Sequence, residues 1–238
     1  MEAIKVQEKP IPFNSEMVNA ILDGRKTQTR RVITPKPGEN IVGFQSWIHQ
    51  DKQLWTEQIH TSDPLHNKLG KDYKCPYGQP GSQLWVRETW ATSLSLDSMS
   101  PSDIGIAARR AGYNSKESPK SDLWYMADMH YRQWGSEKTS LGKSRPSIHM
   151  PRWASRIQLE ITDVRVERLQ EITEADVCAE MGRDGWIRDG LWALPNWEGG
   201  PFDSAQKMFA HLWDSIYKDR GFGWEANPFV WVVEFKKV

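Results

Sequence analysis

The chain has 238 residues, 38% of them hydrophobic, which is enough for a substantial core and excludes a protein that is disordered throughout. Its 31 Lys and Arg residues balance 31 Asp and Glu residues, so no net charge attracts it to nucleic acid in bulk, and any such contact must be local. The two cysteines, Cys75 and Cys178, form no CxxC pair, which argues against a structural zinc site and a disulfide-rich secreted fold.

Targeting and cofactor motifs are not visible in the sequence. The first residues, MEAIKVQEKPIPFN, hold no apolar stretch of signal-peptide length, and no run of about 18 apolar residues could span a membrane. We therefore expect a cytoplasmic protein without a membrane partner. No Walker loop, HExxH motif or catalytic triad occurs, so we expect neither a metal nor a cofactor.

The first part of the chain predicts a helix, an irregular region and a strand. Asn14 or Ser15 can cap a helix whose apolar residues recur at helical spacing, and Gly24 should end it. The segment 35–80 is rich in Pro, Gly, Lys and Asp, so we expect long loops with one short hairpin. Alternating side-chain character over 83–90 predicts a strand with two different faces.

The middle of the chain predicts a surface insertion followed by a long strand. Residues 93–122 are mostly polar, with helical character near 104–111, and a further strand is expected within 123–134. From residue 157 the apolar residues alternate up to residue 166, but the alternation changes phase near Thr162 and Asp163. A bulge in a long, curved strand would produce this shift.

The last third of the chain predicts two helices and a central strand. Thr173 and Asp176 form a capping box at the start of a helix that Gly182 should end. Asp203 is expected to cap a second, longer helix with one apolar stripe. The run 229–235 is apolar on both faces, as in a buried strand.

Strands of unequal length separated by a few helices predict an α+β fold, built on a small and mostly antiparallel β-barrel with flanking helices. No internal repeat and no linker between domains are visible. We therefore expect one domain over residues 1–238, with insertions near 35–80, 93–150 and 183–202.

The densest polar cluster is Gly24-Arg-Lys-Thr-Gln-Thr-Arg-Arg31, which combines donors, hydroxyls and positive charge where a helix gives way to extended chain. Such a cluster is more often a solvated basic turn than a site. In a regular strand Lys26 and Thr29 point to opposite faces, so a shared pocket requires a bend at Thr27 or Gln28.

The residues of this cluster resemble the G-x-K-x-x-T-x-R signature of ASCH domains, which Gly24, Lys26, Thr29 and Arg31 match. Further segments occur in the order found in that family. They are the Pro80-Gly81 turn, Leu84-Trp-Val-Arg-Glu88, the strand and helix from Ile161 to Glu180, and Val230-Trp-Val-Val-Glu-Phe-Lys236. The resemblance implies a PUA-like β-barrel with a pocket for a nucleobase, and the segment 150–156 is similar to longer members encoded in phages and prophages.

The small bacterial ASCH enzymes that the chain resembles remove the acetyl group from N4-acetylcytidine, and the resemblance implies that Lys26, Thr29 and Glu180 are catalytic. Amide hydrolysis needs a nucleophile and a base. Thr29 supplies a hydroxyl that attacks or places a water molecule, and Lys26 can act as the base if burial or neighbouring arginines lower its pKa. Glu180 would orient the lysine or pass a proton to the leaving amine; without the resemblance it reads as a helix-surface carboxylate.

Five further residues are candidates for binding the substrate. Arg31 belongs to the signature. Arg87 and Glu88 lie within a strand, where charge requires either a pocket or a partner, so a salt bridge is the alternative to contact with a base edge. Trp153 offers a planar face beside the cation of Arg152, although packing is the more common use of a single tryptophan.

Two classes of function remain from the sequence. The first is an amidohydrolase acting on a modified nucleobase such as N4-acetylcytidine. The second is a non-catalytic protein of phage origin that binds RNA or a modified DNA base, and ribonuclease activity is a further alternative that the family implies. The expected partner is a modified nucleoside or a single-stranded nucleic acid.

Overall fold

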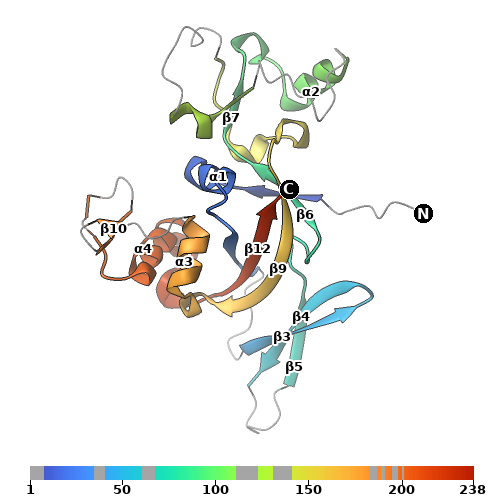
Figure 1. Cartoon of the computed structure of the whole chain (residues 1–238). Coiled ribbons are helices and arrows are strands. Elements are labelled where there is room, and N and C mark those ends of the chain that lie inside the picture. Colours follow the sequence, from blue (N-terminus) through green and yellow to red (C-terminus); the bar gives the residue numbers. More distant parts are fainter. Residues whose placement is uncertain are drawn as a thin grey trace. The chain divides into compact units, whose positions relative to one another are not determined.

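The computed structural model describes residues 8–34, 41–60, 68–110, 123–130, 141–182, 187–188, 191–194, 198–199 and 201–238. These residues form a mixed α+β protein, as predicted (Figure 1). The chain divides into two compact units, each assembled from distant segments: unit 1 is Met1–Gly24, Ser82–Glu160 and Lys237–Val238, and unit 2 is Arg25–Gly81 and Ile161–Lys236. The single domain expected over 1–238 stays a prediction.

Unit 1 contains three paired strand segments and the first helix. Strand β1 (Glu8–Pro12) pairs in parallel with β6 (Gln83–Arg87), and β6 pairs antiparallel with the first residues of β9 (Gln158–Arg168). Helix α1 (Ser15–Leu22) has Asn14 as its N-cap. Gly24 follows with φ of +74°, a left-handed conformation that favours glycine. The predicted helix is therefore confirmed with both of its ends.

The insertion at 93–150 contributes a small sheet and a helix to unit 1. Strand β7 (Trp90–Thr92) pairs antiparallel with β8 (Leu123–Tyr125), and helix α2 (Pro101–Arg110) covers the predicted helical stretch. The strand expected within 123–134 ends after three residues, because the chain turns into the 3-10 helix η2 (Met126–His130). The remainder of that predicted strand lies outside the described residues.

In unit 2 the remainder of β9 lies beside β12 (Phe229–Lys237), which pairs antiparallel with β2 (Gln28–Val32). The predicted phase change in β9 is present, since Leu159 and Ile161 are buried, the next two residues are exposed, and Val164 is buried again. The strands of each unit form open sheets, and no sheet within the described residues closes into a barrel.

Helices α3 (Glu174–Met181) and α4 (Ala205–Tyr217) pack in unit 2 beside β12 (Figure 1). Thr173 caps α3 with the predicted capping box, and Gly182 ends it with φ of +69°. The cap of α4 was predicted wrongly: Ser204, not Asp203, accepts the backbone N–H of Lys207. A shared apolar cluster holds the two helices and the strand together; its members are Leu169, Ile172, Val177, Ala205, Met208, Phe209, Trp213, Val230 and Val232.

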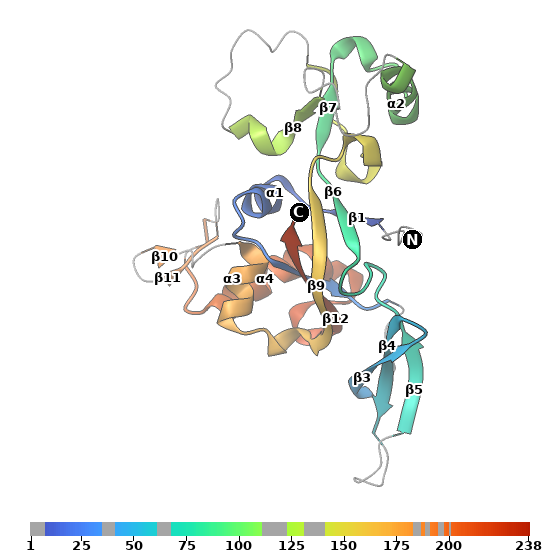
Figure 2. The ribbon, with the colours of Figure 1, turned by 45° about the vertical axis from the view of Figure 1, so that its right-hand side comes forward.

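The segment 35–80 is the main departure from the sequence prediction. Instead of long loops it contains an antiparallel sheet of β3 (Ile41–His49), β4 (Lys52–Ile59) and β5 (Lys68–Tyr73), seen side by side in Figure 2. Gln50 and Asp51 make the turn between β3 and β4 with φ of +47° and +60°, without the Asn-Gly pair that usually signals such a hairpin. Trp55 of β4 packs on Trp231 of β12, with ring centroids 4.8 Å apart, and this long-range contact helps to stabilise the sheet.

The third insertion, near 183–202, holds a two-stranded pairing of β10 (Ile187–Arg188) with β11 (Leu191–Trp192). No helix in the described part of the chain is long and apolar enough to cross a membrane.

Candidate functional site

Lys26 lies just before β2, in a segment of the chain that runs along the last turn of α3. The backbone N–H of Thr27 donates to the carbonyl of Ala179 at 3.1 Å, and the amine of Lys26 donates to the carbonyl of Glu180. The last carbonyls of a helix lack partners within the helix, so this segment satisfies them from outside. Because β2 begins at Gln28, Lys26 lies before the regular strand, and strand alternation does not fix its direction.

The amine of Lys26 is enclosed by the protein, with none of its side chain exposed. Nζ donates to the carbonyl of Gln28 at 2.7 Å and lies 3.6 Å from Oε1 of Glu180. Burial lowers the pKa of Lys26 to about 8, although the charge of Glu180 acts in the opposite direction. A neutral amine keeps two N–H groups, enough to maintain both carbonyl hydrogen bonds after the third proton leaves. Lys26 can therefore act as a base close to neutral pH.

Glu180 is the acidic partner of this amine and is also buried, with 7% of its side chain exposed. Its Oε1 accepts the backbone N–H of Arg30 at 2.9 Å, and its Oε2 lies 3.7 Å from Nη1 of Arg30. Oε2 has no hydrogen-bond partner among the described residues. The structure thus brings together two of the predicted catalytic residues, with the carboxylate held loosely on one side.

Thr29 is buried within β2, opposite Val233 of β12. On either side of it, Gln28 and Arg30 direct their side chains to Asp176 of α3. Alternation along a strand places Thr29 on the opposite face of β2 from these two neighbours. Thr29 is therefore one residue from the carbonyl that accepts the Lys26 amine, but on the other face of the strand from the acidic side chains of α3.

Arg31 is half-buried and shares the face of β2 with Thr29, by the same alternation. Its positive charge lowers the pKa of Lys26 and that of Tyr77, in each case after the larger effect of burial. Burial raises the pKa of Tyr77, whereas it lowers that of Lys26. The cation of Arg31 therefore acts on both the candidate base and a neighbouring phenol.

The sequence did not reveal the charged network on the α3 side of β2. Nη2 of Arg30 lies 3.1 Å from Glu167 and 3.4 Å from Asp176, and Nη2 of Arg165 lies 3.1 Å from Asp176. Arg165 also pairs with Glu234 of β12. The signal that could have revealed it is Gln28 and Arg30 alternating in a strand, since polar side chains on one buried face need partners.

Arg87 and Glu88 belong to unit 1. The guanidinium of Arg87 stacks 4.7 Å from the ring centroid of Trp85. Glu88 is 1% exposed, and both of its oxygens are engaged by Arg156, at 2.9 and 3.0 Å. Burial raises the pKa of Glu88, and the hydrogen bonds from Arg156 oppose this. The structure thus gives Glu88 the salt bridge that was the alternative to contact with a base.

Arg152 and Trp153, also in unit 1, contact other parts of that unit. Nε of Arg152 donates to Glu8 at 2.8 Å. The indole N–H of Trp153 donates to the carbonyl of Pro101 at 3.2 Å, and its ring packs edge-to-face on Trp90 at 5.9 Å. Trp153 thus serves packing within unit 1.

The predicted site residues therefore divide between the two units. Lys26, Thr29, Arg31 and Glu180 lie in unit 2, whereas the four residues just described lie in unit 1.

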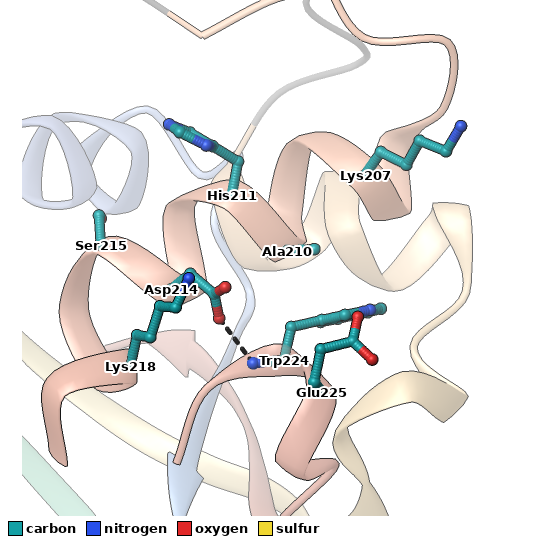
Figure 3. A pocket seen from close by; sticks show the side chains of 8 residues that line it. All are labelled: Lys207, Ala210, His211, Asp214, Ser215, Lys218, Trp224 and Glu225. Carbon is teal, nitrogen blue, oxygen red and sulfur yellow. Dashed lines mark hydrogen bonds between the residues drawn. The ribbon is translucent and has the colours of Figure 1, made fainter. Parts of the chain in front are cut away.

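A cavity of about 620 Å³ lies beside α4, and none of the predicted site residues lines it. Figure 3 shows Asp214 of α4 directed toward the backbone nitrogen of Trp224, whose N–H donates to Oδ1 at 2.6 Å. This hydrogen bond gives the carboxylate a structural role. The lining residues are Lys207, Ala210, His211, Asp214, Ser215, Lys218, Trp224 and Glu225.

Neither a metal centre nor a known relative identifies the site. Within the described ranges, no three His, Cys, Asp or Glu side chains come together in a way that could hold a metal ion. Comparison with family models, curated proteins and solved structures gives no match to this chain.

Proposed function

We propose that this protein is an ASCH-type hydrolase with a PUA-like fold that removes an acyl group from a modified nucleobase such as N4-acetylcytidine. The observation that carries the proposal is the Lys26–Glu180 pair: a fully buried amine 3.6 Å from a buried carboxylate, with the pKa of the amine lowered to about 8. A strongly shifted amine beside a carboxylate is typical of functional sites.

In the proposed reaction Lys26 acts as the general base. Its neutral amine takes a proton from an attacking water molecule while the oxygen adds to the acyl carbonyl carbon. If the hydroxyl of Thr29 attacks instead, its proton must reach the amine through a water molecule, because Thr29 lies on the other face of β2 from Glu180. When the carbon–nitrogen bond breaks, Lys26 returns this proton to the amino nitrogen of the leaving nucleobase. With Thr29 as nucleophile, water then hydrolyses the acyl-threonine ester, so the products are the free base and a carboxylic acid.

Glu180 contributes charge and position in this scheme. Its carboxylate attracts the ammonium form of Lys26, so the proton taken from the nucleophile is stabilised while the tetrahedral intermediate exists. The backbone N–H of Arg30 fixes Oε1 on the side of the amine. Arg31, whose charge acts on Lys26, is suited to bind the anionic or carbonyl part of the substrate.

A purely structural role for Lys26 as a cation at the end of α3 is the main alternative. Lysines near a helix C-terminus do satisfy carbonyls, but an exposed side chain is sufficient for that role. Complete burial of the amine opposes its charged form. This burial is unnecessary for capping but supplies a base at neutral pH, which supports the catalytic interpretation.

The direct test is to incubate the purified protein with N4-acetylcytidine and to follow cytidine and acetate by liquid chromatography. We expect deacetylation by wild type and its loss in Lys26→Met and Glu180→Gln. Lys207→Met, an exposed lysine on α4, is the matched control and should retain activity. If pure wild type forms no product from this nucleoside or from other N4-acylated cytidines, the proposal is wrong.

Non-catalytic binding of RNA or modified DNA has less support. Two of the side chains expected to contact a base, Glu88 and Trp153, already have partners within unit 1. Titration with single-stranded RNA and DNA at low salt, where phosphate contacts are strongest, tests this alternative directly.

A further inference from the structure

Arg30 lies at the point where three acidic side chains of unit 2 meet, and its own side chain is fully buried. Its guanidinium contacts Glu167 and Asp176 through Nη2, at 3.1 and 3.4 Å. Its other terminal nitrogen, Nη1, lies 3.7 Å from Oε2 of Glu180. A buried cation is retained only with good anionic partners, and here two carboxylates hold the guanidinium while a third faces it.

The same residue holds Glu180 in two ways. The backbone N–H of Arg30 donates to Oε1 at 2.9 Å, and the guanidinium attracts Oε2. The hydrogen bond fixes Oε1, whereas Oε2 has no hydrogen bond to the guanidinium and is held by charge alone. Oε1 is also the oxygen that faces the Lys26 amine, so the backbone at residue 30 holds this oxygen while the guanidinium of Arg30 places a positive charge beside Oε2.

Arg30 is itself fixed by the network around it. Asp176 is part of the capping box of α3, and it also accepts hydrogen bonds from Gln28 and Arg165. Burial would raise the pKa of Asp176, but hydrogen bonds from Thr173 and Gln28 and the charge of Arg30 lower it to about 2. This anion is therefore charged at any pH at which the protein would work.

The charged side chains near Glu180 and its partners come from the segment before β2, from β2 itself, and from β9, α3 and β12. The cations are Lys26, Arg30, Arg31 and Arg165, and the anions are Glu167, Asp176 and Glu234. Arg30 contacts Glu180 and two anions of the network, so a change at Arg30 reaches the amine through Glu180.

We propose that Arg30 is a positioning residue, which helps to hold Glu180 with Oε1 toward Lys26 and offsets part of the negative charge that Glu180 directs at that lysine. The catalytic consequence rests on the proposed function, but the effect on Lys26 does not. Burial is the largest cause of the lowered pKa of Lys26; Glu180 opposes it, and the charges of Arg31 and, to a smaller extent, Arg30 add to it. Removing Arg30 would leave Glu180 to act on Lys26 without its counter-charge.

The first measurement is the pKa of Lys26 by NMR of the whole protein, from the pH dependence of its side-chain ¹³C signal, assigned through Lys26→Met. We expect the wild-type midpoint to lie about 8, and Arg30→Met to raise it by about one pH unit. Arg30→Lys, which keeps the charge but not the two-pronged donor, should raise it less. The control is Arg145→Lys in unit 1, a buried arginine 3.4 Å from Asp97, which should leave the midpoint unchanged.

The second measurement is the pH profile of hydrolysis. Arg30→Met should move the rise of kcat to higher pH and lower kcat about tenfold near neutral pH, with KM little changed. A merely structural effect would lower the rate at every pH without moving the profile. If Arg30→Met does not fold, Arg30→Lys decides the question through its kcat and its Lys26 midpoint.

The outcomes separate the two proposals. An unchanged Lys26 midpoint in a folded Arg30 variant overturns the role of Arg30, whether or not the protein is active. Absence of hydrolysis in wild type, combined with the expected midpoint shift, removes the proposed function but supports the electrostatic role of Arg30.

Discussion

Each unit contains a cluster of acidic and basic side chains around a buried glutamate, and the two clusters differ in how well their hydrogen bonds are satisfied. In unit 1, Glu88 and Arg156 form a two-pronged pair at 2.9 and 3.0 Å, and Arg156 binds Asp128 at 2.8 and 2.9 Å. In unit 2, Glu180 lies 3.6 Å from Lys26 and 3.7 Å from the guanidinium of Arg30. In the first cluster both carboxylate oxygens accept short hydrogen bonds from an arginine, whereas in the second the charged groups are farther apart. We call the first the closed cluster and the second the loose cluster.

This difference separates a structural ion pair from a candidate reactive one. A carboxylate with both oxygens in short, charge-assisted hydrogen bonds has little capacity left for a substrate. A buried amine whose pKa is lowered to about 8, by contrast, can exchange a proton under ordinary conditions. The charged pair of unit 1 therefore indicates a structural role, whereas that of unit 2 indicates a candidate reactive site.

The largest expected effect is on the loose cluster. Replacing Lys26 with Met should lower the rate of N4-acetylcytidine hydrolysis by about 10²- to 10⁴-fold, because a general base contributes on that order. Steady-state kinetics with matched circular dichroism spectra check this. A Lys26→Met protein that keeps more than half of the wild-type rate would place the base elsewhere.

The next largest effect is expected in the closed cluster of unit 1, on stability and not on activity. Glu88→Gln should lower the free energy of unfolding by roughly 3 kcal/mol, since it removes the charged partner of a partly buried arginine. Urea denaturation measures the loss. The position of the pH profile of hydrolysis should stay the same in this variant, whereas Glu180→Gln should change activity more than stability; the opposite pattern would contradict the assignment of the two clusters.

The pH dependence of activity follows from Lys26. Since the neutral amine is the active form, the rate should rise about tenfold per pH unit below the pKa of about 8 and level off above it. The folded pKa lies below the ordinary value of 10.5, so stability should also increase as pH rises from about 8 to 10.5. A rate that falls over the same range would show that the protonated lysine is required.

The smallest effect concerns the helix that carries Glu180. Thr173→Ala removes the hydroxyl that caps α3 and should lower stability by about 1 kcal/mol. Thermal unfolding of this variant, with Ser204→Ala at the cap of α4 as a comparison, measures it.

The lowered pKa of Asp176 implies stability that is present above pH 3.8 and is lost as pH falls toward about 2.

Local features of the sequence predicted local features of the fold well. The capped helices from Asn14 and Thr173 were predicted with both ends because caps depend on a few adjacent residues. The sheet of β3, β4 and β5 was missed, since its turn uses Gln50 and Asp51 in place of glycine and its stabilisation comes from a distant strand. Long-range packing of this kind leaves no short pattern to detect.

For the candidate site, the sequence by itself determined the chemical groups: an amine, a hydroxyl and a carboxylate, with Lys26 and Thr29 three residues apart. Only the tertiary structure decided that the carboxylate of Glu180, 154 residues from Lys26, reaches that amine, and that Arg30 lies between Glu180 and two further acids. The physical reason is that side-chain identity is local, whereas burial and the distance between charges depend on how separate segments pack, and those two quantities set the pKa of the lysine.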